Sequence, residues 1–156
     1  MNISNLQYKI KSASCQTIIN HLKECTDYFI PSLHTYVNID EYGRKIFDES
    51  MTFESWDGCD LVGLLAAYFN DNKTKVGFIT NISVLKEYQS IGVASRLMKA
   101  AIDYGKKNNF VKLKLEIRSD NKKASQLYKK FGFIVIEKKK NTIIMSNDVV
   151  CNKNKQ

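Results

Sequence analysis

The hydrophobic positions of the chain follow two different periods, and each change of period marks a predicted element. Residues 76–85 carry an apolar or β-branched side chain at every second position, which predicts a long strand. Residues 91–107 carry apolar side chains at three- and four-residue steps with charged residues between them, which predicts an amphipathic helix. Residues 111–117 alternate again and predict another strand, one face of which is solvated or functional.

Shorter segments on both sides show the same two patterns. The predicted strands are residues 8–13, 51–58, 59–72, 133–140 and 141–148, and the predicted helices are residues 15–29, 40–50 and 121–133, the last ending at Gly132. The pair Asp57-Gly58 favours a hairpin turn, so the strands on its two sides should be antiparallel neighbours. The order β-α-α-β-β-β-α-β-α-β-β predicts an α/β domain with a mixed sheet.

The composition is typical of one globular domain. The chain has 156 residues and 44% of them are hydrophobic, so residues 1–150 are predicted to form a single domain, followed by a polar tail over residues 151–156. The start of the chain does not resemble a targeting segment. No window approaches the roughly 18 to 20 apolar residues that span a bilayer. We therefore expect a cytoplasmic protein without a membrane partner.

Charge and cysteine content exclude further classes. The net charge of +8 comes largely from scattered lysines rather than from an arginine-rich stripe, so we expect a solvated surface and no nucleic-acid partner. A second explanation of the charge is a bound polyanionic small molecule. The four cysteines form no C-x-x-C pair, and His21 and His34 are the only histidines, so neither a metal site nor a disulfide framework is predicted.

Small residues gather where the long predicted strand meets the predicted helix. The segment "QSIGVA" places Gly92 and Ala94 at the helix start, behind Gln89. The first backbone N–H groups of a helix have no partner within the helix and bind anions where the side chains around them are small. The segment is not the phosphate loop of nucleotide hydrolases, and it lacks the third glycine of a dinucleotide fingerprint. It predicts a phosphate-binding helix start of another kind.

The same residues resemble the GCN5-related N-acetyltransferases. Residues 89–94 match that family's pyrophosphate signature, which is Gln or Arg, two residues, Gly, one residue, then Gly or Ala. Residues 115–133, "LEIRSDNKKASQLYKKFGF", resemble the second family motif at the usual distance. The resemblance covers residues 76–145 well and the first half only by element order. It implies a mixed central sheet of about six to seven strands flanked by about four helices, with a splayed central strand.

The resemblance also implies which residues would bind acetyl-CoA, the acyl donor. The backbone of Ile82, Ser83 and Val84 would pair with the pantetheine arm. The pyrophosphate would be held by Gln89, Ser90, Ile91, Gly92, Val93, Ala94 and Ser95. Arg96 and Lys86 are phosphate neighbours or solvated cations. Asn121 matches the family position that bonds to the pantetheine arm, and it is also suited to cap the following helix.

Two residues are candidates for acid–base chemistry. By resemblance Tyr128 would give a proton to the leaving thiolate, although an aromatic side chain at that spacing is also typical of a core. Glu116 stands where ribosomal-protein N-terminal acetyltransferases have their glutamate base, although a charged strand residue is also typical of a solvated face. A water chain beside Asn81 and Thr80 is the alternative route for the proton. Glu54 and His34 are more distant alternatives.

These features predict an acetyl-CoA-dependent N-acetyltransferase that acts on a primary amine of a small metabolite, such as an amino sugar. The amine would attack the thioester directly, because no nucleophile motif indicates a covalent intermediate. The acceptor would bind near Phe29, Ser32, His34, Tyr36 and Trp56. The alternatives are an N-terminal peptide or protein acetyltransferase, an enzyme with a macromolecular acceptor such as aminoacyl-tRNA, and a non-catalytic acyl-CoA-binding module. Dimers are common in the family, but no self-complementary surface is evident.

Overall fold

The computed structural model describes residues 5–29 and 31–150, which form two compact units. The N-terminal unit comprises the described residues of Met1–Ala66 and Asn81–Leu97. The C-terminal unit comprises Ala67–Thr80 and the described residues of Met98–Gln156. The predicted tail, residues 151–156, lies outside the described residues. That residues 1–150 form a single domain remains a prediction.

The first three strands of the N-terminal unit are neighbours in the sheet, so the two strands beside Asp57-Gly58 are adjacent as predicted. Strand β1, Leu6–Ile10, runs antiparallel to β2, Met51–Asp57, with Leu6 opposite Asp57. The chain then turns at Gly58, which has a φ of +59°, into β3, Asp60–Tyr68. Glycine adopts this left-handed conformation at little cost. The backbone N–H of Leu85 donates to the carbonyl of Val62 (2.8 Å), which ties the segment after β4, Val76–Val84, to β3.

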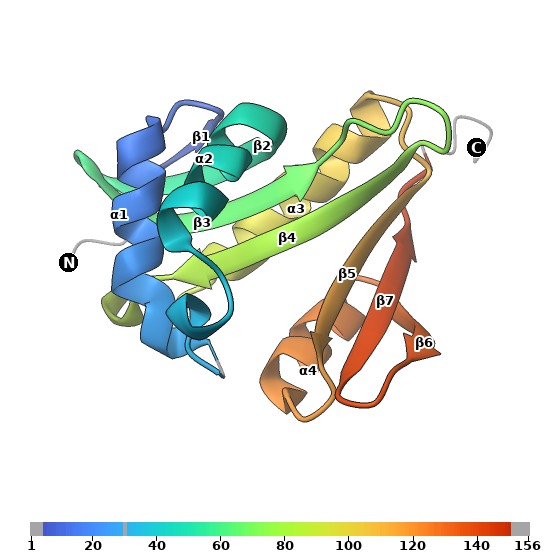
Figure 1. Cartoon of the computed structure of the whole chain (residues 1–156). Helices are drawn as coiled ribbons and strands as arrows, with labels where there is room; N and C mark the ends of the chain where they lie inside the picture. Colours follow the sequence, from blue (N-terminus) through green and yellow to red (C-terminus); the bar gives the residue numbers. More distant parts are fainter. Residues whose placement is uncertain (1–4, 30, 151–156) are drawn as a thin grey trace. The chain divides into compact units, whose positions relative to one another are not determined.

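Two helices of the N-terminal unit pack against each other (Figure 1). Helix α1, Cys15–Cys25, begins after Ser14, and α2, Ile39–Glu49, begins after Asn38. Each capping side chain accepts a bond from a backbone N–H of the first turn, which satisfies a group that the helix itself cannot. The short helices η2, Thr26–Tyr28, and η3, Leu33–Thr35, lie in the connection, so α1 ends earlier than predicted. The apolar core of the unit includes Ile18, Leu22, Leu33, Ile46, Trp56 and Leu64.

The C-terminal unit is built on strands at the other end of the strand order. Strand β5, Lys112–Arg118, runs antiparallel to β7, Thr142–Asp148, which in turn pairs with β6, Ile134–Lys138. Helix α4, Lys122–Lys130, follows β5, and most of α3, Val93–Lys107, belongs to this unit. The fully buried side chains include Leu113, Leu115, Phe133 and Met145.

The strand order confirms the predicted fold class. Over the described residues the order is β1-β2-β3-β4-β5-β7-β6, a seven-stranded mixed sheet accompanied by four α-helices. Strand β4 runs parallel to β5 over Val76–Ile79 and Lys112–Leu115. This ladder covers only the first four residues of each strand.

Candidate functional site

The predicted anion site lies in the turn between β4 and α3, within the N-terminal unit. After β4 the chain forms the short helix η4, Lys86–Tyr88, and then a turn that contains Gly92. The φ angle of Ser90 is +65° and that of Gly92 is +93°. No heavy atom lies within 4 Å of the place where a Cβ on Gly92 would stand. Backbone conformation therefore favours glycine here, and the absent side chain leaves open space at the helix start.

The turn presents backbone N–H groups at the start of α3. The first backbone hydrogen bond of this helix runs from Arg96 N–H to the carbonyl of Gly92 (3.1 Å). The amides of Val93, Ala94 and Ser95 precede it, and amides in that position lack an acceptor within the helix. Such groups, together with the helix dipole, attract phosphate. The residues present therefore suit the pyrophosphate of acetyl-CoA.

Two contacts hold the turn and the helix start in place. The side-chain amide of Gln89 donates from Nε2 to the carbonyl of Val84 (2.9 Å), which links the first residue of the signature to the end of β4. A Cβ on Gly63 of β3 would lie 2.8 Å from Val93 Cγ1 and 3.3 Å from Leu97 Cδ1. Gly63 thus allows the first turn of α3 to pack directly on the strand, a contact that the sequence patterns do not reveal.

Behind the predicted pantetheine-binding strand lies a buried polar network. His21 Nδ1 is 3.0 Å from the carbonyl of Leu61, and His21 Nε2 is 2.9 Å from Ser83 Oγ. Burial lowers the pKa of His21 below its usual 6.5, so the imidazole is neutral at pH 7. Cys25 Sγ lies 3.6 Å from the same Nε2, and burial raises the pKa of this thiol to about 12. The sequence patterns do not reveal this network, because His21 and Ser83 are 62 positions apart.

Glu54 is fully occupied by structural hydrogen bonds. Its two carboxylate oxygens accept bonds from the backbone of Ser12 and Ala13 and from the side chains of Ser12, Thr52 and Trp56, at 2.6 to 3.3 Å. A buried carboxylate is stable only with such partners. Its oxygens are thus committed to joining β2 to the loop before α1. Trp56, a predicted acceptor-site residue, is buried in the core of this unit.

Most of the other residues predicted for the acceptor and the phosphates contact other parts of the protein. Phe29 packs against the core, Ser32 Oγ donates to Asp27 (3.0 Å), and His34 Nδ1 lies 3.1 Å from Thr26 Oγ1. Tyr36 is exposed. The guanidinium carbon of Arg96 lies 3.8 Å from the ring centre of Tyr8. The backbone N–H of Lys86 donates to Tyr28 Oη (3.0 Å). The Arg96 side chain thus contacts β1.

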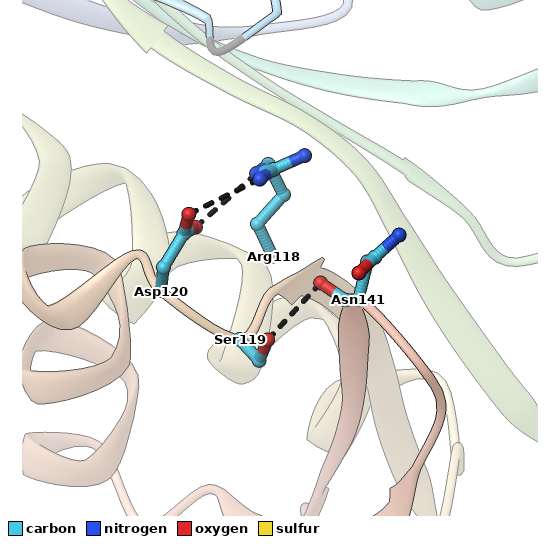
Figure 2. Close-up of polar contacts among 4 residues, drawn as sticks. All are labelled: Arg118, Ser119, Asp120 and Asn141. Carbon is cyan, nitrogen blue, oxygen red and sulfur yellow. Dashed lines mark hydrogen bonds and ion pairs between the residues drawn. The ribbon is translucent and has the colours of Figure 1, made fainter.

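The second motif lies in the C-terminal unit, at the junction of β5 and α4. Asn121 caps α4, because its Oδ1 accepts from Ala124 N–H (3.1 Å). Arg118 and Asp120 form an ion pair with two bonds, at 3.2 and 3.1 Å, and Ser119 donates from N and from Oγ to the carbonyl of Asn141 (Figure 2). These bonds fix the loop that carries the motif, and the side-chain Nδ2 of Asn121 is not used by the cap.

Glu116 is held between two partners on the exposed face of β5. Thr142 Oγ1 donates to Glu116 Oε2 (2.7 Å), and Lys139 Nζ lies 3.3 Å from the same oxygen. The hydrogen bond from Thr142, aided by Lys139, holds the pKa of Glu116 below its usual 4.5. The carboxylate is therefore ionised at neutral pH, and its base role stays a prediction.

Tyr128 lies in the interior of the C-terminal unit, only 4% exposed, with its ring centre 5.9 Å from that of Phe133. Burial raises the pKa of the phenol well above its usual 10, so the group keeps its proton at neutral pH. A proton donor needs that property, but the acid role itself stays a prediction.

The predicted site residues thus fall into both units. Ile82–Val84 and Gln89–Arg96 lie in the N-terminal unit, whereas Glu116, Asn121 and Tyr128 lie in the C-terminal unit. Among the described residues, no group of His, Cys, Asp and Glu is arranged to hold a metal ion. In the same ranges, no helix is long and apolar enough to cross a membrane.

The sequence model of the acetyltransferase (GNAT) family matches residues 15–133. The chain therefore belongs to the acetyltransferase (GNAT) family, which confirms the resemblance seen in its motifs.

Individual relatives match over shorter stretches. N-alpha-acetyltransferase 30 of Schizosaccharomyces pombe is 33% identical over 57 residues, or 36% of this chain and 38% of that protein. Spermidine N(1)-acetyltransferase of Escherichia coli is 44% identical over 55 residues, or 35% of this chain and 30% of that protein. These matches thus span 38% and 30% of the lengths of the two curated relatives. The PaiA N-acetyltransferase of Thermoplasma acidophilum, solved in complex with coenzyme A, shares the fold, with a TM-score of 0.71 at 15% identity over 91% of this chain and 99% of that one.

Proposed function

We propose that this chain transfers the acetyl group of acetyl-CoA to the primary amine of a small metabolite, an amino sugar or a similar polar amine. The observation that carries the proposal is the start of α3, where a left-handed turn at Ser90 and Gly92 precedes backbone amides with open space beside them. A pyrophosphate is the ligand that such amides suit. Ile82, Ser83 and Val84 would offer their backbone to the pantetheine arm, and Asn121 would contribute Nδ2.

Direct attack of the amine on the thioester is the mechanism we favour. The buried Cys25 thiol, with its pKa raised to about 12, is a poor candidate for a covalent intermediate, because the thiolate is the reactive form. Tyr128 would donate the proton that the leaving thiolate takes up. Glu116 would accept a proton from the attacking amine. The hydrogen bond from Thr142 lowers its pKa, which keeps the carboxylate ionised but also makes it a weaker base.

A second candidate function is acetylation of peptide α-amines. The match to N-alpha-acetyltransferase 30 of Schizosaccharomyces pombe favours it, as does the "LEIR" segment around Glu116. The match to the spermidine N(1)-acetyltransferase of Escherichia coli favours a small amine instead.

A cytoplasmic location is also part of the proposal. Cys15, Cys25 and Cys59 are free thiols, as is usual in a reducing compartment.

An amine panel tests the proposal. Thiol release from acetyl-CoA would be followed with glucosamine, with spermidine and with a short peptide that has a free α-amine. Release that depends on glucosamine or spermidine supports the proposal, and release with the peptide alone favours the second candidate. If acetyl-CoA binds but no amine stimulates thiol release, the chain is a non-catalytic acyl-CoA-binding module.

A further inference from the structure

Asn81, in β4, has one hydrogen-bonding atom that the described protein leaves unused. The residue is only 4% exposed. Its Nδ2 group donates to Ser83 Oγ (3.0 Å) and approaches the carbonyl of Leu64 at 3.5 Å. Its Oδ1 is buried and has no hydrogen-bond partner among the described residues. Buried polar atoms in folded proteins almost always have a partner, so an orphan oxygen of this kind needs an explanation.

The neighbouring bonds fix which end of the Asn81 amide is the orphan. The carbonyl of Leu61 can only accept, so the proton of the neutral His21 is on Nδ1, and Nε2 is left as an acceptor. The hydroxyl of Ser83 then donates to His21 Nε2 and accepts from Asn81 Nδ2. Asn81 thus donates to Ser83, Ser83 donates to His21, and His21 donates to the carbonyl of Leu61. The free end is therefore a hydrogen-bond acceptor.

An acceptor selects its ligand by chemistry. A carbonyl oxygen repels phosphate oxygens and the thioester carbonyl, which are acceptors themselves, and binds an N–H group. In the proposed function the pantetheine arm pairs with the backbone of residues 82–84, which leaves the Asn81 side chain for the other substrate. An amide oxygen can accept from an amine N–H and carries no charge that would hold the amine as an ammonium ion.

We propose that Asn81 Oδ1 accepts a hydrogen bond from an N–H of the acceptor amine, with Ser83 and His21 as positioning residues that fix its direction. The inference rests on the proposed function, because it requires that an amine acceptor exists. It adds a substrate contact in the N-terminal unit. It also explains why an unsatisfied oxygen is kept in the interior, since binding sites retain groups that cost stability until the ligand arrives.

Steady-state kinetics with Asn81→Leu test the contact, using whichever amine of the panel gives the fastest wild-type turnover. Leucine has a similar volume and no acceptor. We expect the KM for the amine to rise about tenfold while the KM for acetyl-CoA stays within about twofold. Ser83→Ala keeps Oδ1 but frees its direction, so we expect a smaller rise in the amine KM, about threefold. Ser83→Ala also provides the test if Asn81→Leu does not fold.

Ser146→Ala is the matched control, because Ser146 is a buried strand residue of the C-terminal unit whose Oγ also lacks a partner among the described residues. Its two KM values should equal those of the wild type. An amine KM unchanged in both Asn81→Leu and Ser83→Ala, or a parallel rise of both KM values, would overturn the inference while the proposed function stands. A wild-type protein that binds acetyl-CoA but turns over no amine would overturn both.

Discussion

Replacing Gly92 by alanine should weaken acetyl-CoA binding and should also lower the stability of the fold. At a φ of +93° an alanine is strained by roughly 1–2 kcal/mol, the usual cost of a left-handed conformation. A Cβ there meets no atom within 4 Å, so no steric term is added. For a protein of this size that free energy lowers the melting temperature by about 2–8 °C.

The larger effect arises at the helix start. A turn that relaxes from the strained φ moves the amides of α3 that we assign to the pyrophosphate. Loss of one hydrogen bond to a charged group removes about 1.5–3 kcal/mol, so the dissociation constant for acetyl-CoA should rise roughly 10- to 100-fold. Isothermal titration calorimetry with acetyl-CoA measures this change directly.

Gly58→Ala is the matched control for this prediction. Gly58 also has a positive φ, +59°, and a Cβ on it likewise meets no atom within 4 Å, but it lies in the β2–β3 turn. The two variants should lose similar stability, and only Gly92→Ala should lose affinity for acetyl-CoA. Equal affinities of Gly92→Ala and wild type would refute our assignment of the anion site.

Three further substitutions test the other assignments. Tyr128→Phe keeps the buried ring but removes the proton donor. We therefore expect kcat to fall at least about 100-fold, with unchanged acetyl-CoA affinity. An unchanged kcat would remove the phenol from the mechanism. Glu116→Gln should lower kcat/KM at least about tenfold at neutral pH, and a wild-type rate would assign Glu116 to structure alone. Because folding lowers the pKa of Glu116, the stability that its charge contributes is present above pH 4.5 and is lost as the pH falls through the folded-state pKa, so urea titrations of the two proteins should converge in acid. Gly63→Ala places a Cβ 2.8 Å from Val93 Cγ1, which should cost about 1–3 kcal/mol of unfolding free energy and weaken acetyl-CoA binding; unaltered binding would show that this packing does not position the helix start.

The order of the elements could be predicted from the sequence because each element has a clear period. The alternation in residues 76–85 and the helical spacing after Ile91 correspond to β4 and α3. The start of α3 could be predicted too, since the conformation of Gly92 and the small side chains beside it are local properties. Local pattern does not determine where an element ends, and α1 ends at Cys25 rather than at the predicted residue 29.

Contacts between distant segments could not be predicted in this way. Glu54 looks like an ordinary polar residue of a half-solvated strand, yet its partners Ser12 and Ala13 lie more than 40 positions away and bury it completely. The hydrogen bond between His21 and Ser83 depends on how α1 packs over the strands. The hydrophobic period of a segment predicts its secondary structure but not which distant segment it packs against. Trp56 is buried in the core of its unit, a placement that its residue type alone does not reveal, because an aromatic side chain suits either a core or a binding site.

The most direct test of the account is thermal unfolding of the wild-type protein with and without saturating acetyl-CoA, with ATP as a control polyanion. A ligand at about 100 times its dissociation constant contributes about 2.7 kcal/mol to the stability of the folded state, which is several degrees for a protein of this size. We expect that shift with acetyl-CoA and not with ATP. No shift with acetyl-CoA, or an equal shift with both ligands, would contradict the account of the α3 start as a coenzyme A site.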